Sequence, residues 1–165
     1  MTTTITGTTV AATNFTGSGA ALTGMNIGVA SMIRLNGSNG YGSTNTNIRR
    51  FVNTVVNQGT DITYTDSASL GATFTINASG VYSISASEEA NGASVAGLSL
   101  NSTELSTGIV SMTRADVLSM SATSLNTPNV STVTAYFVVG DVIRSHTQGS
   151  AAGIATRTYF TITRV

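Results

Sequence analysis

The sequence predicts an all-β domain, a sandwich or barrel of short antiparallel strands. Residues that favour strands are frequent, and from about residue 29 onward short alternating segments follow one another between turn signals. No segment has the apolar spacing of an amphipathic helix. The chain has 165 residues, 41% of them hydrophobic, which is enough for the core of one domain.

Residues 1–28 differ from the rest of the chain and form a separate segment ahead of the domain of residues 29–165. They contain no charged residue, and a few apolar side chains are spread between short Gly, Thr and Ser elements. Such a segment cannot bury a core alone, so it is either a disordered tail or an arm that becomes ordered on a partner. The absence of charge favours the arm. Its apolar residues are the candidates for attachment: Val10, Phe15, Leu22 and Met25.

The first strands of the domain are predicted at residues 29–35 and 48–56, with a Gly- and Asn-rich surface loop at 36–47 between them. After GTDITYTD, the stretch of residues 71–77 alternates with a period of two, which indicates one buried and one solvent-facing side. The next strands repeat this alternation. The residues expected to face the core are Ala72, Phe74, Ile76, Tyr82, Ile84, Ala86, Ala96, Leu98, Leu100, Leu118, Met120 and Ala122.

The stretch VSTVTAYFVV, after Pro128, has apolar residues on both faces. Val133, Ala135, Phe137 and Val139 are expected to face the core together, while residues 134, 136 and 138 face the other way. We expect burial on both sides, the second side against another subunit. A Gly-Asp turn at residues 140–141 and a closing strand with inward Phe160 and Ile162 complete the domain.

The charge composition excludes many functions. Only 8% of residues are charged, the formal net charge is +0, every basic residue is Arg, and there is no Cys. A chain without Lys has no Walker loop, and a chain without net charge has no field that attracts nucleic acid. No apolar run approaches the length of a membrane span. We therefore expect no nucleic-acid or membrane partner, no cofactor and no metal, and we expect that the protein is not an enzyme.

The few ionisable residues are expected to have structural roles. Glu88 and Glu89 are neighbours on a strand and should point to opposite faces, one outward and one paired with an Arg. The same argument places Arg49 and Arg50 on opposite faces. His146 is expected to be a partly exposed strand residue, with a pH sensor or a ring on a threefold axis as alternatives. Four Asp residues are candidates for calcium binding, but they form no dense calcium loop: Asp61, Asp66, Asp116 and Asp141. We expect Asp141 to cap its turn instead.

Several segments resemble the tumour-necrosis-factor-like jelly roll that is also found in the globular heads of complement proteins. They are GATFTINASGVYSIS, LSLN, TAYFVVGDVIR and TYFTITRV, within residues 29–165. The resemblance implies an antiparallel jelly-roll sandwich that forms a homotrimer around a threefold axis. The trimer interface is then expected at Thr134, Tyr136 and Val138.

A narrower resemblance concerns the opening phrase, the stretch from MIRLNGSNGYG to GATFTINASGVY, and the lack of Cys and Lys. These features are similar to bacteriophage virion surface proteins such as capsid decoration or cement proteins, head fibres and fibre tips. The resemblance implies a trimeric knob on the capsid surface, attached to the major capsid protein or another virion protein through residues 1–28. The alternative is a tail- or head-fibre tip that binds a host-surface glycan or receptor.

Overall fold

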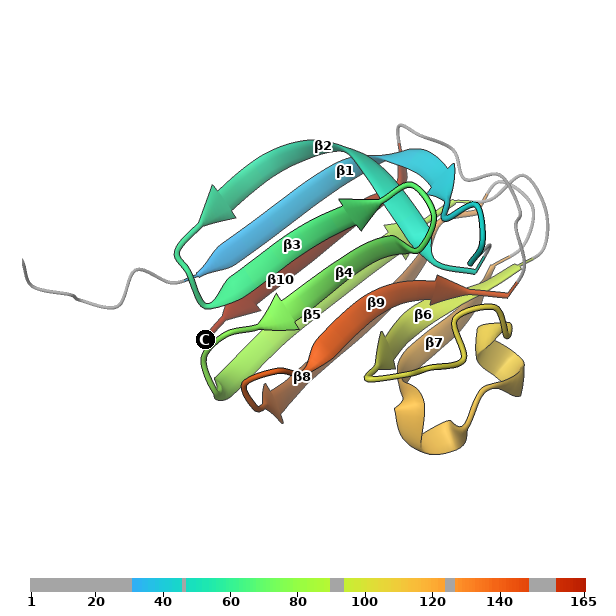
Figure 1. The fold of residues 1–165 in the computed structure, drawn as a ribbon. Coiled ribbons are helices and arrows are strands. Elements are labelled where there is room, and N and C mark those ends of the chain that lie inside the picture. Colours follow the sequence, from blue (N-terminus) through green and yellow to red (C-terminus); the bar gives the residue numbers. More distant parts are fainter. Residues whose placement is uncertain (1–30, 46, 90–93, 124–126, 149–156) are drawn as a thin grey trace, which may run out of the picture.

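The computed structural model describes residues 31–45, 47–89, 94–123, 127–148 and 157–165. Within these residues the chain forms ten β-strands and two short 3-10 helices, arranged as two five-stranded antiparallel sheets that pack face to face (Figure 1). The predicted arm of residues 1–28 lies outside the described residues, so its role stays a prediction.

The first sheet has the strand order β2-β1-β10-β5-β8, and the second sheet has the order β3-β4-β9-β6-β7. Neighbours in both sheets are antiparallel. The two sheets therefore take strands from all parts of the domain, as a jelly roll requires. The strands are β1 (Met32–Tyr41), β2 (Arg49–Gln58), β3 (Ile62–Ser67), β4 (Gly71–Ile76), β5 (Gly80–Glu88), β6 (Ser94–Leu100), β7 (Val117–Thr123), β8 (Asn129–Phe137), β9 (Val142–Thr147) and β10 (Tyr159–Arg164).

The predicted loop at residues 36–47 is wrong in its first half, because β1 continues to Tyr41. Gly37 and Gly40 have φ angles of 79° and 72°, which side chains other than Gly rarely adopt. The pairing of β1 with β2 shifts register twice, the second time between Ser38 and Tyr41. The glycines of this stretch thus mark irregular positions inside a strand rather than a surface loop.

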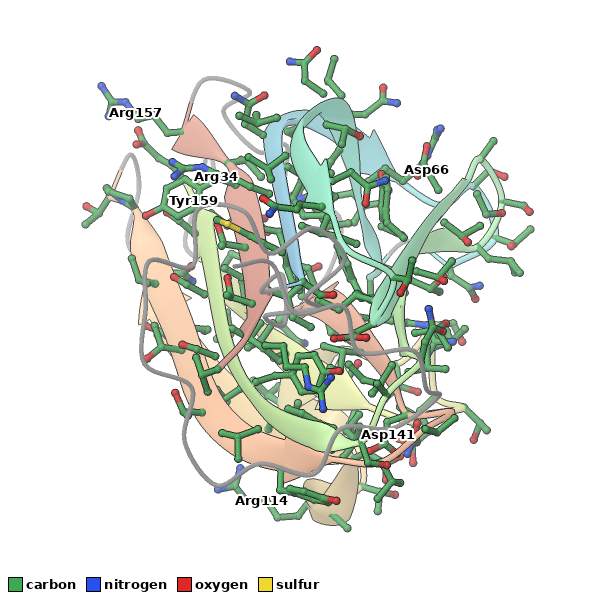
Figure 2. The ribbon with its side chains drawn as sticks, turned by 90° about the vertical axis from the view of Figure 1, so that its left-hand side faces the viewer. Arg34, Asp66, Arg114, Asp141, Arg157 and Tyr159 are labelled. Atoms are coloured by element: carbon green, nitrogen blue, oxygen red, sulfur yellow. The ribbon has the colours of Figure 1, made fainter. Side chains whose placement is uncertain are left out.

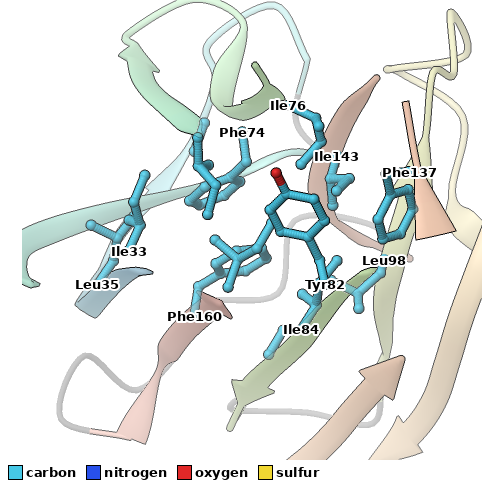
Figure 3. Close-up of a cluster of buried hydrophobic side chains, with 14 of the residues drawn as sticks. Ile33, Leu35, Phe74, Ile76, Tyr82, Ile84, Leu98, Phe137, Ile143 and Phe160 are labelled. Atoms are coloured by element: carbon cyan, nitrogen blue, oxygen red, sulfur yellow. The ribbon is translucent and has the colours of Figure 1, made fainter. Parts of the chain in front are cut away.

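The hydrophobic core lies between the sheets and has a stack of aromatic rings at its centre (Figure 3). The rings of Phe74 and Phe160 are stacked with centroids 3.8 Å apart, and Phe51 packs against both at 6.4 and 5.9 Å. The alternation of β4 and β5 is confirmed. The expected core residues that are buried are Ala72, Phe74, Ile76, Tyr82, Ile84, Ala86, Ala96, Leu98, Phe137, Phe160 and Ile162.

Three residues that were expected in the core are exposed instead. Met120 is 45% exposed and Ala122 is exposed, because they pair with Gly97 and Val95 of β6, which alternate with the buried Ala96 and Leu98, and a register shift separates these pairs from Ser99. Val139 is 62% exposed, because β8 ends at Phe137 and the chain then turns through Gly140, whose φ is 94°. The expected alternation therefore fails at a register shift and beyond the end of a strand.

The outer face of the second sheet is covered by its own chain. Residues 101–116, which include η2 (Ile109–Ser111) and η3 (Arg114–Asp116), lie over β6 and β9 (Figure 1). Ile109 is 1% exposed, and a Cβ on Gly97 would lie 2.7 Å from its side chain. A Cβ there would lie even closer to the carbonyl oxygen of Ser119 on β7, so the glycine allows both this segment and the neighbouring strand to approach β6 closely.

Candidate interaction surface

Among the described residues, no segment covers the outer face of the first sheet over the three strands β10, β5 and β8. We call this uncovered surface the bare face. Along these strands the inward side chains fill the core, and the alternate residues point outward. The exposed or half-exposed outward positions hold only Thr, Ser, Val and Tyr: Tyr159, Thr161, Thr163, Val81, Ser83, Ser85, Val130, Thr132, Thr134 and Tyr136. No charged side chain interrupts this surface.

Large apolar side chains gather at one end of this face, near the C-terminus. Val81 and Tyr136 are directly opposite each other on β5 and β8 and are 40% and 65% exposed. Val138 and Val139 follow Tyr136 beyond the end of β8, and the backbone amide of Val165 donates to the carbonyl of Val81 over 3.0 Å. We call these residues the C-terminal patch: Val81, Tyr136, Val138, Val139 and Val165.

The predicted interface residues point as the sequence indicates. Thr134, Tyr136 and Val138 are all exposed and belong to this outer face and its C-terminal patch. Thr134 Oγ1 lies 3.4 Å from Ser83 Oγ on the neighbouring strand. The isolated chain therefore leaves exposed the residues that were expected to be buried against another subunit, and the subunit contact itself stays a prediction.

One exposed charge borders this face, because Arg34 on β1 is the cross-strand partner of the outward-facing Thr161 on β10. All seven Arg and all seven acidic residues are described, and four pairs form between them: Arg49–Glu88, Arg50–Asp66, Arg157–Glu89 and Arg164–Asp61. Arg34, on β1, is exposed, and none of the seven carboxylates lies within ion-pair distance of it. Figure 2 shows Arg34, Tyr159 and Arg157 at one end of the sandwich, away from Arg114 and Asp141.

The expectation for Glu88 and Glu89 is wrong, because both side chains are buried and both are paired. Arg49 is fully buried, contacts Glu88 through two guanidinium nitrogens and lies 4.0 Å from the Tyr41 ring centroid. Burial raises the pKa of Tyr41 to about 12. Glu88 is the last residue of β5, so the alternation that would separate the two carboxylates ends there. This buried cluster of Tyr41, Arg49 and Glu88 joins the strands β1, β2 and β5.

The two neighbouring arginines do point apart, as expected. Arg50 forms a partly exposed pair with Asp66, with Nη2 to Oδ2 at 2.7 Å, and this hydrogen bond raises the pKa of Arg50. Arg49, however, is satisfied within its own chain and not at a subunit contact.

His146 is fully buried, which contradicts both the partly exposed position and the ring on a threefold axis. Its Nε2 lies 2.8 Å from the carbonyl of Thr107, and its Nδ1 lies 3.2 Å from Ser99 Oγ. Burial lowers the pKa of His146, so the ring is neutral at pH 7. The histidine ties residues 101–116 to the second sheet.

The carboxylates form no metal centre among the described residues, which hold no group of three potential ligands. Asp61 is paired with Arg164, and this hydrogen bond lowers the pKa of Asp61. Asp141 accepts from the backbone amide of Val138 at 2.9 Å, which confirms that it caps its turn. The helices of the described chain are two 3-10 turns of three residues, so none of them can span a bilayer.

Comparison with known proteins identifies the fold. No family model and no curated protein sequence matches the chain. Among solved structures, murine APRIL at pH 8.0 superposes with a TM-score of 0.62 and 12% identity, over 82% of this chain and 99% of that chain. The Eiger TNF of S. frugiperda gives a TM-score of 0.53 with 9% identity, over 82% and 92% of the two chains. GITRL from bushbaby gives 0.50 with 14% identity, over 82% and 94%.

These likenesses, together with the two antiparallel five-stranded sheets, show that the chain has the TNF-like all-β jelly-roll fold. The predicted fold class is confirmed. At identities of 9 to 14% the likeness carries the fold and not the activity. The trimer, the virion location and the capsid partner stay predictions.

Proposed function

We propose that the protein is a non-enzymatic structural protein of the bacteriophage virion surface. Its jelly roll forms a homotrimeric knob, and the knob decorates or cements the capsid through residues 1–28. Two features of the sequence support this proposal: the uncharged arm with its spaced apolar residues, and the resemblance to virion surface proteins. The fold supports self-association, because the outer face of β10, β5 and β8 is uncovered, whereas residues 101–116 cover β6 and β9 of the other sheet.

The observation that carries the proposal is the outer face of β10, β5 and β8, whose outward residues are all uncharged. A side chain as large as Tyr136 is 65% exposed there, and Val81, Val138 and Val139 are exposed beside it. Contiguous exposed apolar surface of this kind marks an interaction site. A face without charges also avoids the desolvation cost that buried ions bring to an interface. Self-association through this face would bury the C-terminal patch.

A ring of three subunits requires two different surfaces on each copy, because contacts around a threefold axis are head to tail. The outer face of the first sheet supplies one surface. The side formed by β7 and β8 supplies the second, where Met120 on β7 is 45% exposed. Both surfaces are uncharged, so their contact leaves no ion without a partner.

Attachment is tested with particles that lack the protein and with variants of the full-length chain. Serine substitution of Val10, Phe15, Leu22 and Met25 together removes the apolar anchors of the arm. The matched control places serine at two exposed apolar residues of the jelly roll, Leu70 and Val110, which are each 50% exposed. We expect the control to sediment with particles and the arm variant to stay in the supernatant.

Electron microscopy of decorated particles then decides the location. Density over the capsid shell agrees with the proposal, and density at the tail supports the fibre-tip alternative with a host-surface glycan or receptor as ligand. Binding that survives in the arm variant would place the attachment site on the jelly roll itself.

A further inference from the structure

The second half of β2 is an open sheet edge. β2 is the outer strand of the first sheet, and among the described residues no strand pairs with its free side (Figure 1). Six of the seven residues Val52–Gln58 are exposed, including Val52 at 57% and Val55 at 51%. This stretch contains no charge and no Pro, the devices that usually protect an edge.

The other outer strands are better protected. The side of β8 is tied to the second sheet by two hydrogen bonds: Asn129 Nδ2 donates to the carbonyl of Ser121 at 2.9 Å, and Ser131 Oγ donates to that of Ala96 at 3.1 Å. β7 lies along this same closed side. β3 has only six residues and carries Asp66, paired with Arg50. The free amides and carbonyls of β2 are therefore the most accessible template for an added strand.

We propose that residues 8–16 of a second copy of this chain add as a strand to the edge Val52–Gln58. The stretch TTVAATNFT is the longest part of residues 1–28 without Gly, and it has no charge. Its nine residues are long enough to pair with the seven residues of the open edge. The inference deepens the proposed function and rests on it, because knobs mounted on a particle have neighbours within reach.

The direction of the chain favours a second copy as the donor. Residue 31 lies at the start of β1, where Met32 is the partner of Gln58 at the end of β2. An arm that folds straight back along its own β2 would run parallel to it. A strand from another copy can run antiparallel, and antiparallel pairing is the more stable form.

The reach of the arm agrees with this arrangement. The fifteen residues from position 16 to position 31 span up to about 50 Å when extended. They also leave Leu22 and Met25 between the added strand and the knob, where these residues stay available for the particle. One arm can then bind the particle and a neighbouring knob together.

The test uses single-cysteine variants of the full-length chain, which has no natural Cys. A chain with Val55→Cys and an isotopically labelled chain with Ala12→Cys are mixed and oxidised, and the mixed disulfide is quantified by mass spectrometry. The control replaces Val55→Cys by Val110→Cys, whose residue is similarly exposed, at 50%, and lies in η2 outside the proposed subunit contact. We expect at least fivefold more mixed disulfide with Val55→Cys than with the control.

A second variant tests the edge without relying on one disulfide geometry. Val52→Lys, added to the Val55→Cys chain, introduces a charge on the edge and should reduce the mixed disulfide to the level of the control. Equal yields from Val55→Cys and Val110→Cys would overturn the proposal. A chain carrying both Val55→Cys and Ala12→Cys that closes only on itself would overturn it too, because the donor would then be the same copy.

The failure of this inference differs from the failure of the proposed function. A chain that binds particles but forms no mixed disulfide refutes the strand addition alone. A chain that forms the disulfide in solution but binds no particle refutes the virion role.

Discussion

The two outer faces of the sandwich are built in opposite ways. On the second sheet, residues 101–116 cover β6 and β9, and the buried interface contains Ile109, Met112 and the fully buried His146. On the first sheet, β10, β5 and β8 have no such cover, and the exposed residues are hydroxyl and apolar side chains. The chain thus covers part of one outer face by itself and leaves β10, β5 and β8 of the other uncovered. Variants on the two faces should behave differently.

The largest effect is expected in the core that both faces share. Phe74→Ala removes a ring that is fully buried and stacked on Phe160 at 3.8 Å. The loss of buried area and the cavity should lower the free energy of unfolding by about 3 to 5 kcal/mol. Urea denaturation followed by circular dichroism measures this. A loss below about 1 kcal/mol would mean that the rings do not pack as described.

A substitution under residues 101–116 should lower the free energy of unfolding as a core substitution does, but by less. Ile109→Ala removes a side chain that is 1% exposed between residues 101–116 and β6, and it should cost about 2 to 3 kcal/mol. Because the partner surface is in the same chain, this loss should not depend on protein concentration.

Tyr136→Ala on the bare face is the matched variant. Its effect should grow with protein concentration, because only the assembled form buries that side chain. Denaturation at two concentrations a hundredfold apart separates the two cases. A concentration-independent loss for Tyr136→Ala would mean that its partner lies within its own chain.

A smaller effect should come from pH, again on the covered face. The folded pKa of His146 lies below its unfolded value, so the unfolded chain binds the extra proton first. Stability is therefore fully present above the unfolded pKa of about 6.5 and is lost as the pH falls below it. Arg144 and Glu104 act on the ring with opposite signs.

The pH effect is isolated with His146→Gln, which retains an N–H donor for the Thr107 carbonyl. The difference in unfolding free energy between pH 7.5 and 5.5 should be smaller in this variant than in the natural chain. An equal slope in both proteins would mean that His146 does not set the pH dependence in this range, where Asp61, whose pKa is lowered by its hydrogen bond with Arg164, stays ionised in both states.

The sequence was informative along strands that pair without a register shift, and it failed on β7, where a shift reverses the faces. Alternation with a period of two places Phe74 and Ile84 in the core and Thr134 and Tyr136 outside it, and burial agrees at all four positions. The same rule fails at Glu88 and Glu89, because the strand ends between them. Their partners Arg49 and Arg157 are 39 and 68 residues away, a separation that no local pattern can predict.

The cover over the second sheet had one local signal. Gly97 stands alone inside the strand pattern ASVAGLSL, and such a glycine often marks the close approach of another backbone. It does not say which segment approaches. His146 was placed wrongly for this reason, since its burial depends on residues 101–116 and not on its own strand.

The central claim is that the bare face is the contact between subunits, and the mass of the full-length protein tests it directly. Light scattering of the natural chain at micromolar concentration should give about three times the chain mass of 16.8 kDa. The Tyr136→Glu variant should give folded monomer or aggregate, because it places an unpaired charge in the contact. A stable natural monomer, or normal trimer assembly by Tyr136→Glu, would contradict the account.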